Sequence, residues 1–143
     1  MSLITLESQH YASLLQDLQE GKDVVACLCA AWCDVCGQYR PDFERLAARH
    51  PGTRFVWIDI EDQADTIGDI DVENFPTLLL QRGDIVAFFG TVLPDAHIAE
   101  RLIQNLAAKS TPVLQAEAAS SEERRNWQEE SNLRRCLQEA MQD

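Results

Sequence analysis

Hydrophobic positions follow two patterns along this chain. Continuous apolar runs bounded by charged or turn residues predict strands that are buried in a sheet. Stretches in which apolar residues recur every three or four positions predict helices that bury one face. The predicted strands are residues 3–6, 24–32, 53–60, 75–81 and 85–90. The predicted helices are residues 9–20, residues 33–50, a short segment within 61–71, and a helix that starts at Pro94.

The order of these elements is β-α-β-α-β-α-β-β-α, which predicts an α/β sandwich with a mixed sheet. Arg82, Gly83 and Asp84 form a turn between the last two strands, so these two strands should make a hairpin. Pro41 interrupts the helical pattern of residues 33–50 and should kink that helix.

The C-terminal part of the chain has a different pattern. Residues 109–123 are small, polar and weakly patterned, which predicts a linker. Ser120 and Glu123 have the spacing of a capping box for the helix that follows. One apolar face of that helix contains Leu133, Cys136, Leu137, Ala140 and Met141.

We therefore divide the chain into a domain at residues 1–109 and a linker with an amphipathic helical extension at residues 110–143. The extension is expected to cap the sheet, to form a dimer, or to bind a partner by helix-in-groove contacts through residues 120–143.

Composition narrows the function. The 143 residues suit one domain, and 45% of them are hydrophobic, which is enough for a core. The net charge of −12 disfavours nucleic acid and anionic membranes as partners. We find no apolar run that could span a bilayer and no secretory signal at the start, so we expect a cytoplasmic protein. Its five cysteines then do not indicate a disulfide framework.

Cys33 and Cys36 form a C-x-x-C pair directly after Trp32, at a predicted strand-to-helix junction. The pair is read as a redox couple, a metal clip or two buried structural thiols. Cys27 and Cys29 share one face of the preceding strand, because side chains repeat every two residues. Zinc sites usually pair two C-x-x-C motifs, and the histidines lie at no ligand-like spacing, so we expect no metal.

The element order and these motifs resemble the thioredoxin family over roughly residues 4–107. The resemblance implies a thioredoxin-like three-layer α/β/α sandwich with a central mixed sheet, plus the C-terminal helix. Its features are Trp32 before the first cysteine, Pro41 at the family's helix kink, Phe75-Pro76-Thr77 at its cis-proline loop, Arg82 to Val86 at its hairpin turn, and Gly90 near its last substrate-contacting loop.

The resemblance further implies a thiol–disulfide oxidoreductase that acts on protein disulfides. Cys33, at the N-terminus of a helix, would attack the substrate, and Cys36 would then resolve the mixed disulfide. The redox-active Cys33–Cys36 disulfide would serve in place of a cofactor. An upstream reductase would be the second partner. Trp32, Phe75, Pro76, Phe89 and Gly90 would form the substrate-binding surface.

Four residues depart from the family pattern and are expected to tune the pair. Asp34 and Val35 stand where the family most often has Gly-Pro, and a carboxylate beside Cys33 disfavours its thiolate. We therefore expect a less acidic Cys33 and a more reducing couple.

Cys27 occupies the position of the family's buried aspartate, and Trp57 that of its lysine partner. The proton of Cys36 would then be accepted by water or by Glu61, or Cys36 would have no general base. Cys27 is read as a small apolar core residue or as a third redox thiol.

An alternative comes from a different functional class. Thioredoxin folds also serve as binding modules without turnover. The chain would then be an adaptor or chaperone whose cysteines are incidental and whose C-terminal helix finds the partner.

Overall fold

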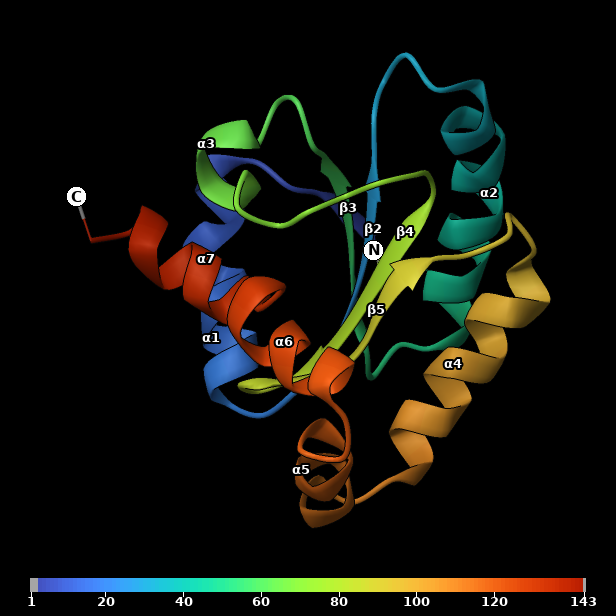
Figure 1. Cartoon of the computed structure of the whole chain (residues 1–143). Helices are drawn as coiled ribbons and strands as arrows, with labels where there is room; N and C mark the ends of the chain where they lie inside the picture. Colours follow the sequence, from blue (N-terminus) through green and yellow to red (C-terminus); the bar gives the residue numbers. More distant parts are fainter. Residues whose placement is uncertain (1–2, 143) are drawn as a thin grey trace.

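The computed structural model describes residues 3–142 (Figure 1). The strands are β1 (Leu3–Thr5), β2 (Asp23–Cys29), β3 (Arg54–Asp59), β4 (Thr77–Arg82) and β5 (Ile85–Thr91). The helices are the 3-10 turn η1 (Ser8–His10), α1 (Tyr11–Gln19), α2 (Asp34–Arg49), α3 (Ala64–Ile67), α4 (Ala96–Ala108), α5 (Thr111–Ala118), α6 (Glu122–Glu130) and α7 (Leu133–Ala140). The predicted element order of the domain is therefore confirmed.

The five strands form one mixed sheet in the order β1-β3-β2-β4-β5. β2 lies at its centre, parallel to β3 and antiparallel to β4. The parallel pairs need crossover connections, which α1 and α2 supply, while Gly83 with a φ of 61° permits the tight β4–β5 hairpin. The mixed sheet predicted from the sequence is confirmed.

Helices cover both faces of the sheet (Figure 1). One core cluster joins α2 and α4 to the face that carries Cys27 and Cys29. The other joins α1, α3 and α7 to the face that carries Leu28 and Val56. This is the predicted three-layer sandwich. Within residues 3–142, no helix combines the length and the apolar character that crossing a bilayer requires.

The strand predicted for residues 24–32 ends earlier, at Cys29. The following residues form the turn that leads into α2, in which the Cys33 N–H donates to the Ala30 carbonyl over 3.1 Å. α2 then continues past Pro41 as one 16-residue helix. Pro41 lies inside this helix, and it does not end it.

The linker prediction for residues 109–123 is wrong over much of its length, because α5 lies within it. The Ser110 hydroxyl accepts from the Val113 N–H, and Pro112 lies in the first turn, where its missing N–H costs nothing. Leu114 is 2% exposed and joins the core cluster of α2 and α4. One buried leucine and a good N-cap thus stabilise a helix that has little amphipathic pattern.

The predicted capping box is also wrong. Ser121, one residue later, is the N-cap of α6, and its hydroxyl accepts from the Arg124 N–H over 3.1 Å. The Ser120 hydroxyl instead donates to the Glu117 carbonyl at the end of α5. The tail is then two helices, because Asn132 starts α7 as a second N-cap.

α6 lies along the outer side of β5. The Gln128 side chain accepts from the Val86 N–H over 2.7 Å and donates to the Val86 carbonyl over 2.9 Å. These are the backbone groups that another strand would otherwise bond. Phe88 also contacts Trp127 edge-on, at 5.8 Å between ring centroids. The amide of Gln128 thus completes the hydrogen bonding of β5 at this position.

The apolar face of α7 packs within the chain. Leu133 and Leu137 are fully buried and join the cluster of α1 and α3, while Met141 is 46% exposed. The extension therefore caps one face of the sheet, which was the first of the three roles expected for it. A partner or dimer contact through residues 120–143 stays a prediction, and it would have to use the outer faces of α6 and α7. The division of the chain at residue 109 also stays a prediction.

A buried amide pair fixes α7 to the β4–β5 hairpin. The Gln81 amide donates to the Asn132 Oδ1 over 2.7 Å and accepts from the Leu133 N–H over 2.9 Å. The Asn132 amide donates to the Asp84 carboxylate over 2.8 Å. Gln81 is fully buried and Asn132 is 2% exposed, so water cannot replace these bonds.

We expect Asn132→Ala to lower the free energy of unfolding by about 1–3 kcal/mol, because it removes the N-cap of α7 and one partner of Gln81. Urea denaturation followed by circular dichroism measures the change. Asn126→Ala, at an exposed position of α6, is the matched control. Equal stability of the two variants would contradict the role given to Asn132.

Candidate functional site

The N-terminus of α2 presents the C-x-x-C pair. Cys33 is the N-cap residue in an extended conformation, and Asp34 is the first residue of the helix. Cys33 is half-buried, whereas Cys36, one turn later, is 2% exposed and faces the sheet. The predicted position of Cys33 at the N-terminus of a helix, with Cys36 one turn later, is therefore confirmed.

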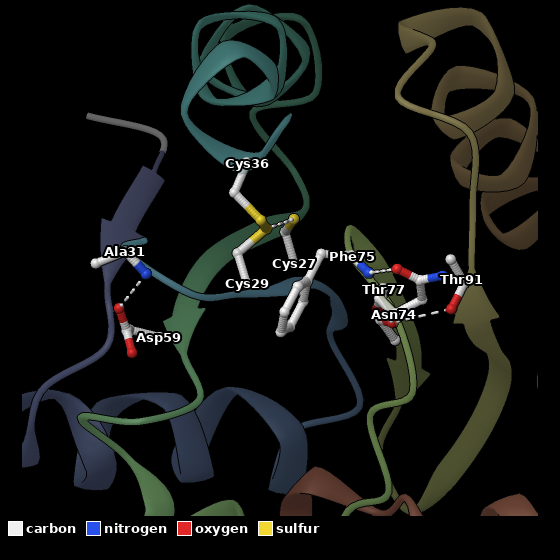
Figure 2. Close-up of a disulfide and its surroundings, with 9 residues drawn as sticks. All are labelled: Cys27, Cys29, Ala31, Cys36, Asp59, Asn74, Phe75, Thr77 and Thr91. Atoms are coloured by element: carbon white, nitrogen blue, oxygen red, sulfur yellow. Dashed lines mark hydrogen bonds between the residues drawn. A yellow bond between two sulfur atoms is a disulfide. The ribbon is translucent and has the colours of Figure 1, made fainter. Parts of the chain in front are cut away.

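The disulfide in the structure joins Cys36 to Cys29, and Cys33 is a free thiol (Figure 2). The pair implied by the resemblance is Cys33–Cys36, so the structure differs from it. The difference has a geometric cause: Cys29 ends β2 directly beneath the first turn of α2, and the two Cα atoms are 5.9 Å apart, within the range of disulfides. Cys29 is thus a site residue that was absent from the sequence-based set, and the Cys33–Cys36 pair stays a prediction.

Cys27 lies deeper on the same strand face. It is fully buried, and its Sγ is 3.7 Å from that of Cys29 (Figure 2). Burial strongly raises the pKa of the Cys27 thiol, so this group remains protonated and neutral. Among residues 3–142, the structure groups no set of histidine, cysteine and carboxylate side chains that could hold a metal ion.

Trp57 is paired with Cys27 across the β2–β3 ladder and is 8% exposed. The Arg40 guanidinium lies over its ring, 5.0 Å from the centroid, and donates to the Thr5 hydroxyl over 2.8 Å. Its positive charge lowers the pKa of Cys27, against the larger effect of burial. Arg40 is a cation beside this cluster that the sequence-based set of tuning residues did not include.

The other tuning residues are exposed. Asp34 and Val35 lie on the outer side of the first turn of α2, and Val35 is 39% exposed. Glu61 is also exposed, in the turn after β3. The structure thus places the Asp34 carboxylate in solvent beside Cys33, where screening weakens its effect.

Asp59 holds the segment that leads to Cys33. Its carboxylate accepts from the Ala31 N–H over 3.0 Å (Figure 2), and from the backbone N–H groups of Glu61 and Asp62 over 2.9 and 3.1 Å. Asp59 ends β3 opposite Cys29. A signal existed in the sequence, since a carboxylate at the end of a strand that neighbours the active-site strand lies at the same edge of the sheet.

The loop before β4 faces the same region. The Phe75–Pro76 peptide bond is cis. The Asn74 side chain accepts from the Phe75 N–H over 3.0 Å, and the Thr77 hydroxyl donates to the Asn74 carbonyl over 2.6 Å (Figure 2). Trp32 is 66% exposed, and its ring contacts that of Phe75 edge-on at 5.5 Å. The structure therefore brings Trp32, Phe75 and Pro76 together.

Phe89 and Gly90 belong to β5, an outer strand of the sheet. Phe89 packs against the core cluster of α1, α3 and α7, on the face opposite that of Cys36. Both residues line a pocket of about 540 Å³, together with Thr91 and with Trp127 of α6. The C-terminal extension therefore contributes to the surface beside the predicted substrate loop, which the sequence reasoning did not foresee.

We expect Asp59→Ala to lower the free energy of unfolding by about 1–3 kcal/mol, because three backbone N–H groups lose their acceptor. Thiol reactivity of Cys33 should change as well, since the Ala31 anchor is lost. Chemical denaturation and the alkylation rate of Cys33 measure the two effects. Asp62→Ala, at an exposed position of the same turn, should leave both unchanged. An Asp59→Ala protein with unaltered stability would refute the anchor.

The alignments with two thioredoxins cover only part of either protein. Putative thioredoxin H10 of Arabidopsis thaliana is 37% identical over 59 residues, which are 41% of this chain and 38% of that protein. Putative thioredoxin 2 of Streptomyces coelicolor is 27% identical over 86 residues, which are 59% of this chain and 64% of that protein. The chain thus covers less than two thirds of either relative.

Solved structures share the fold. A thioredoxin h from poplar superposes with a TM-score of 0.69 at 20% identity, over 77% of this chain and 100% of that one. Mitochondrial thioredoxin 3 from Saccharomyces cerevisiae, in its oxidised form, gives 0.61 at 20% identity, over 73% and 95%. A model of the thioredoxin family matches residues 2–107, which include the cysteine pair, the cis-proline loop and the whole sheet. The chain therefore belongs to the thioredoxin family.

Proposed function

We propose that this chain is a thiol–disulfide oxidoreductase that reduces protein disulfides through Cys33 and Cys36. The observation that carries the proposal is the position of Cys33, a half-buried free thiol at the N-cap of α2, with Cys36 one turn behind it. Unpaired backbone N–H groups at a helix N-terminus stabilise an anion, and the thiolate is the nucleophile of disulfide exchange.

Two exchanges make up the reaction. The Cys33 thiolate attacks one sulfur of the substrate disulfide, forms a mixed disulfide and releases the other substrate sulfur as a thiolate. Cys36 then attacks the Cys33 sulfur, so that the Cys33–Cys36 bond forms and the substrate leaves as a dithiol. Two electrons pass from the protein to the substrate. An upstream reductase must return them, which makes such an enzyme the second expected partner.

Substrate would bind over Trp32, Phe75 and Pro76. The exposed indole of Trp32 and the ring of Phe75 offer apolar contact beside Cys33. An extended segment of the substrate would pair with the backbone of the cis-proline loop. The proposal includes a cytoplasmic location, in which surrounding thiols keep the pair reduced.

The buried environment of Cys36 points to slow resolution. Cys27, at the position where the family has a buried aspartate, is protonated and cannot accept the proton of Cys36. Trp57 correspondingly replaces the lysine, so that no buried charge is left unpaired. We propose that water takes this proton. We also propose that the exposed Asp34 carboxylate disfavours the Cys33 thiolate and thereby makes the couple more reducing.

The replacement of the family's buried aspartate and lysine by Cys27 and Trp57 also favours the alternative, a binding module with little turnover. An adaptor of this kind would keep its partner when Cys33 is replaced, whereas a reductase would lose its activity. One variant therefore separates the two functions.

We expect Cys33→Ser to abolish the reduction of insulin disulfides when dithiothreitol is the electron donor, because the attacking thiol is missing. Cys36→Ser should accumulate a mixed disulfide with the substrate, because the resolving thiol is missing. Turbidity of the released insulin chain and non-reducing electrophoresis report the two results. Cys136→Ser should keep wild-type turnover. Full activity of Cys33→Ser would reject the proposed reaction and leave the binding module.

Alkylation of the reduced protein tests the accessibility on which the mechanism depends. Burial raises the pKa of Cys136 to about 11, so its thiolate is scarce at neutral pH. We expect iodoacetamide at pH 7 to label Cys33 first, and the labelling of Cys136 to accelerate by about tenfold per pH unit until its pKa is reached. Mass spectrometry of digests at several pH values gives both rates. Faster labelling of Cys136 than of Cys33 at pH 7 would contradict this order.

A further inference from the structure

Cys36 has a neighbouring cysteine on each of two elements. Cys33 precedes it by one turn of α2, and Cys29 lies below it at the end of β2, bonded to it in this structure (Figure 2). Cys36 and Cys29 are 2% and 1% exposed, whereas Cys33 is half-buried at the surface. The three sulfur atoms thus lead from the surface into the core.

We infer that Cys29 is a third redox residue of this chain, which replaces Cys33 as the disulfide partner of Cys36. The oxidised protein then contains a buried Cys29–Cys36 disulfide and a free Cys33 thiol. The inference extends the proposed function, because it gives the oxidised pair a second step.

That step is a balanced isomerisation. The Cys29 thiolate attacks the Cys36 sulfur of the Cys33–Cys36 disulfide. The Cys29–Cys36 bond forms, the Cys33–Cys36 bond breaks, and Cys33 leaves as a thiolate that takes up the proton lost by Cys29. No electrons enter or leave, since the substrate disulfide accepted both of them in the preceding exchange.

The surroundings favour this direction. The leaving sulfur, Cys33, is at the N-terminus of α2, where the helix stabilises negative charge. The attacking sulfur has the Cys27 thiol 3.7 Å away, and a protonated Cys27 can donate to the charge on Cys29. The product disulfide is buried beneath the first turn of α2, which shields it from external thiols.

The consequence is a nucleophile that survives oxidation. In the Cys33–Cys36 form the surface cysteine is consumed, whereas in the Cys29–Cys36 form it is regenerated. Cys33 can then attack a second disulfide, which forms a mixed disulfide and releases one substrate sulfur as a thiolate. A thiol of that substrate then displaces Cys33, so the second disulfide is exchanged without net reduction while the Cys29–Cys36 disulfide stays in the core. A protein in this state exchanges disulfides without first meeting its reductase.

Disulfide mapping tests the inference directly. Reduced full-length protein is oxidised with diamide and quenched in acid, and its free thiols are blocked with N-ethylmaleimide in denaturant. Chymotrypsin cleaves after Leu28 and Trp32, so that Cys29 falls on one fragment and Cys33 with Cys36 on the next. A Cys29–Cys36 disulfide links these two fragments, a Cys33–Cys36 disulfide stays within the second, and tandem mass spectrometry of the second fragment locates the maleimide. The fragment linked to Cys36 identifies its partner.

In the wild-type protein we expect Cys36 linked mainly to Cys29, with maleimide on Cys33. Cys33→Ser should still form the Cys29–Cys36 disulfide. Cys29→Ala should lower the maleimide-labelled fraction of Cys33 in the oxidised protein by about tenfold or more, because only Cys33–Cys36 can then form. Cys136→Ala, which removes a free cysteine of α7 outside this cluster, is the matched control and should map as the wild type does.

Two results would overturn the inference: a wild-type map with Cys36 linked to Cys33 alone, or a Cys33→Ser protein that stays reduced under oxidant that oxidises the wild type. The second result does not depend on whether Cys29→Ala folds. The map is also independent of turnover. A Cys29–Cys36 disulfide in a protein that does not reduce insulin would support the inference while rejecting the proposed function. A protein that reduces insulin but forms only the Cys33–Cys36 disulfide would reject the inference alone.

Discussion

The complete enclosure of β2 is the constraint on which this structure depends. β2 pairs with a strand on each side, and helices cover both of its faces, so every side chain from Val24 to Cys29 lies in the core. Such positions accept small or apolar groups and exclude unpaired charge. Thiol side chains are small and uncharged, and they can still form disulfides. The end of β2 also fixes where α2 begins, and therefore where Cys33 and Cys36 lie.

The C-terminal extension is attached by a different kind of interaction. Two amide side chains, Gln128 and Asn132, bond to backbone or buried polar groups of the β4–β5 hairpin, and apolar residues of α7 fill the space beside α1 and α3. Hydrogen bonds of this kind specify one arrangement, because a shifted helix would leave buried polar atoms unpaired. The extension is consequently an integral layer of the molecule, and Trp127 lines a pocket together with Phe89 and Gly90.

Resemblance to the thioredoxin family, and not a local pattern, implied that Trp32, Phe75 and Pro76 lie together. The sequence alone was sufficient for the element order and the mixed sheet. Long apolar runs and strong turn residues determine these features locally. The Cys29–Cys36 pair could not be predicted in this way, because it depends on how the two-residue period of a strand meets the first turn of a helix that crosses above it. α5 was missed because one buried leucine stabilises it. Gln81 and Asn132 are 51 residues apart in sequence, and no local pattern connects them.

The hydrogen bonds of Gln128 to Val86 have a consequence for association between molecules. A sheet with an open outer strand can grow by accepting a strand from another chain, which is a route to domain swapping and to amyloid. Within residues 3–142, the outer strand β5 has the N–H and the carbonyl of Val86 occupied by a side chain of its own molecule, and the other outer strand, β1, is three residues long. Both features hinder the pairing of these edges with a strand of another molecule.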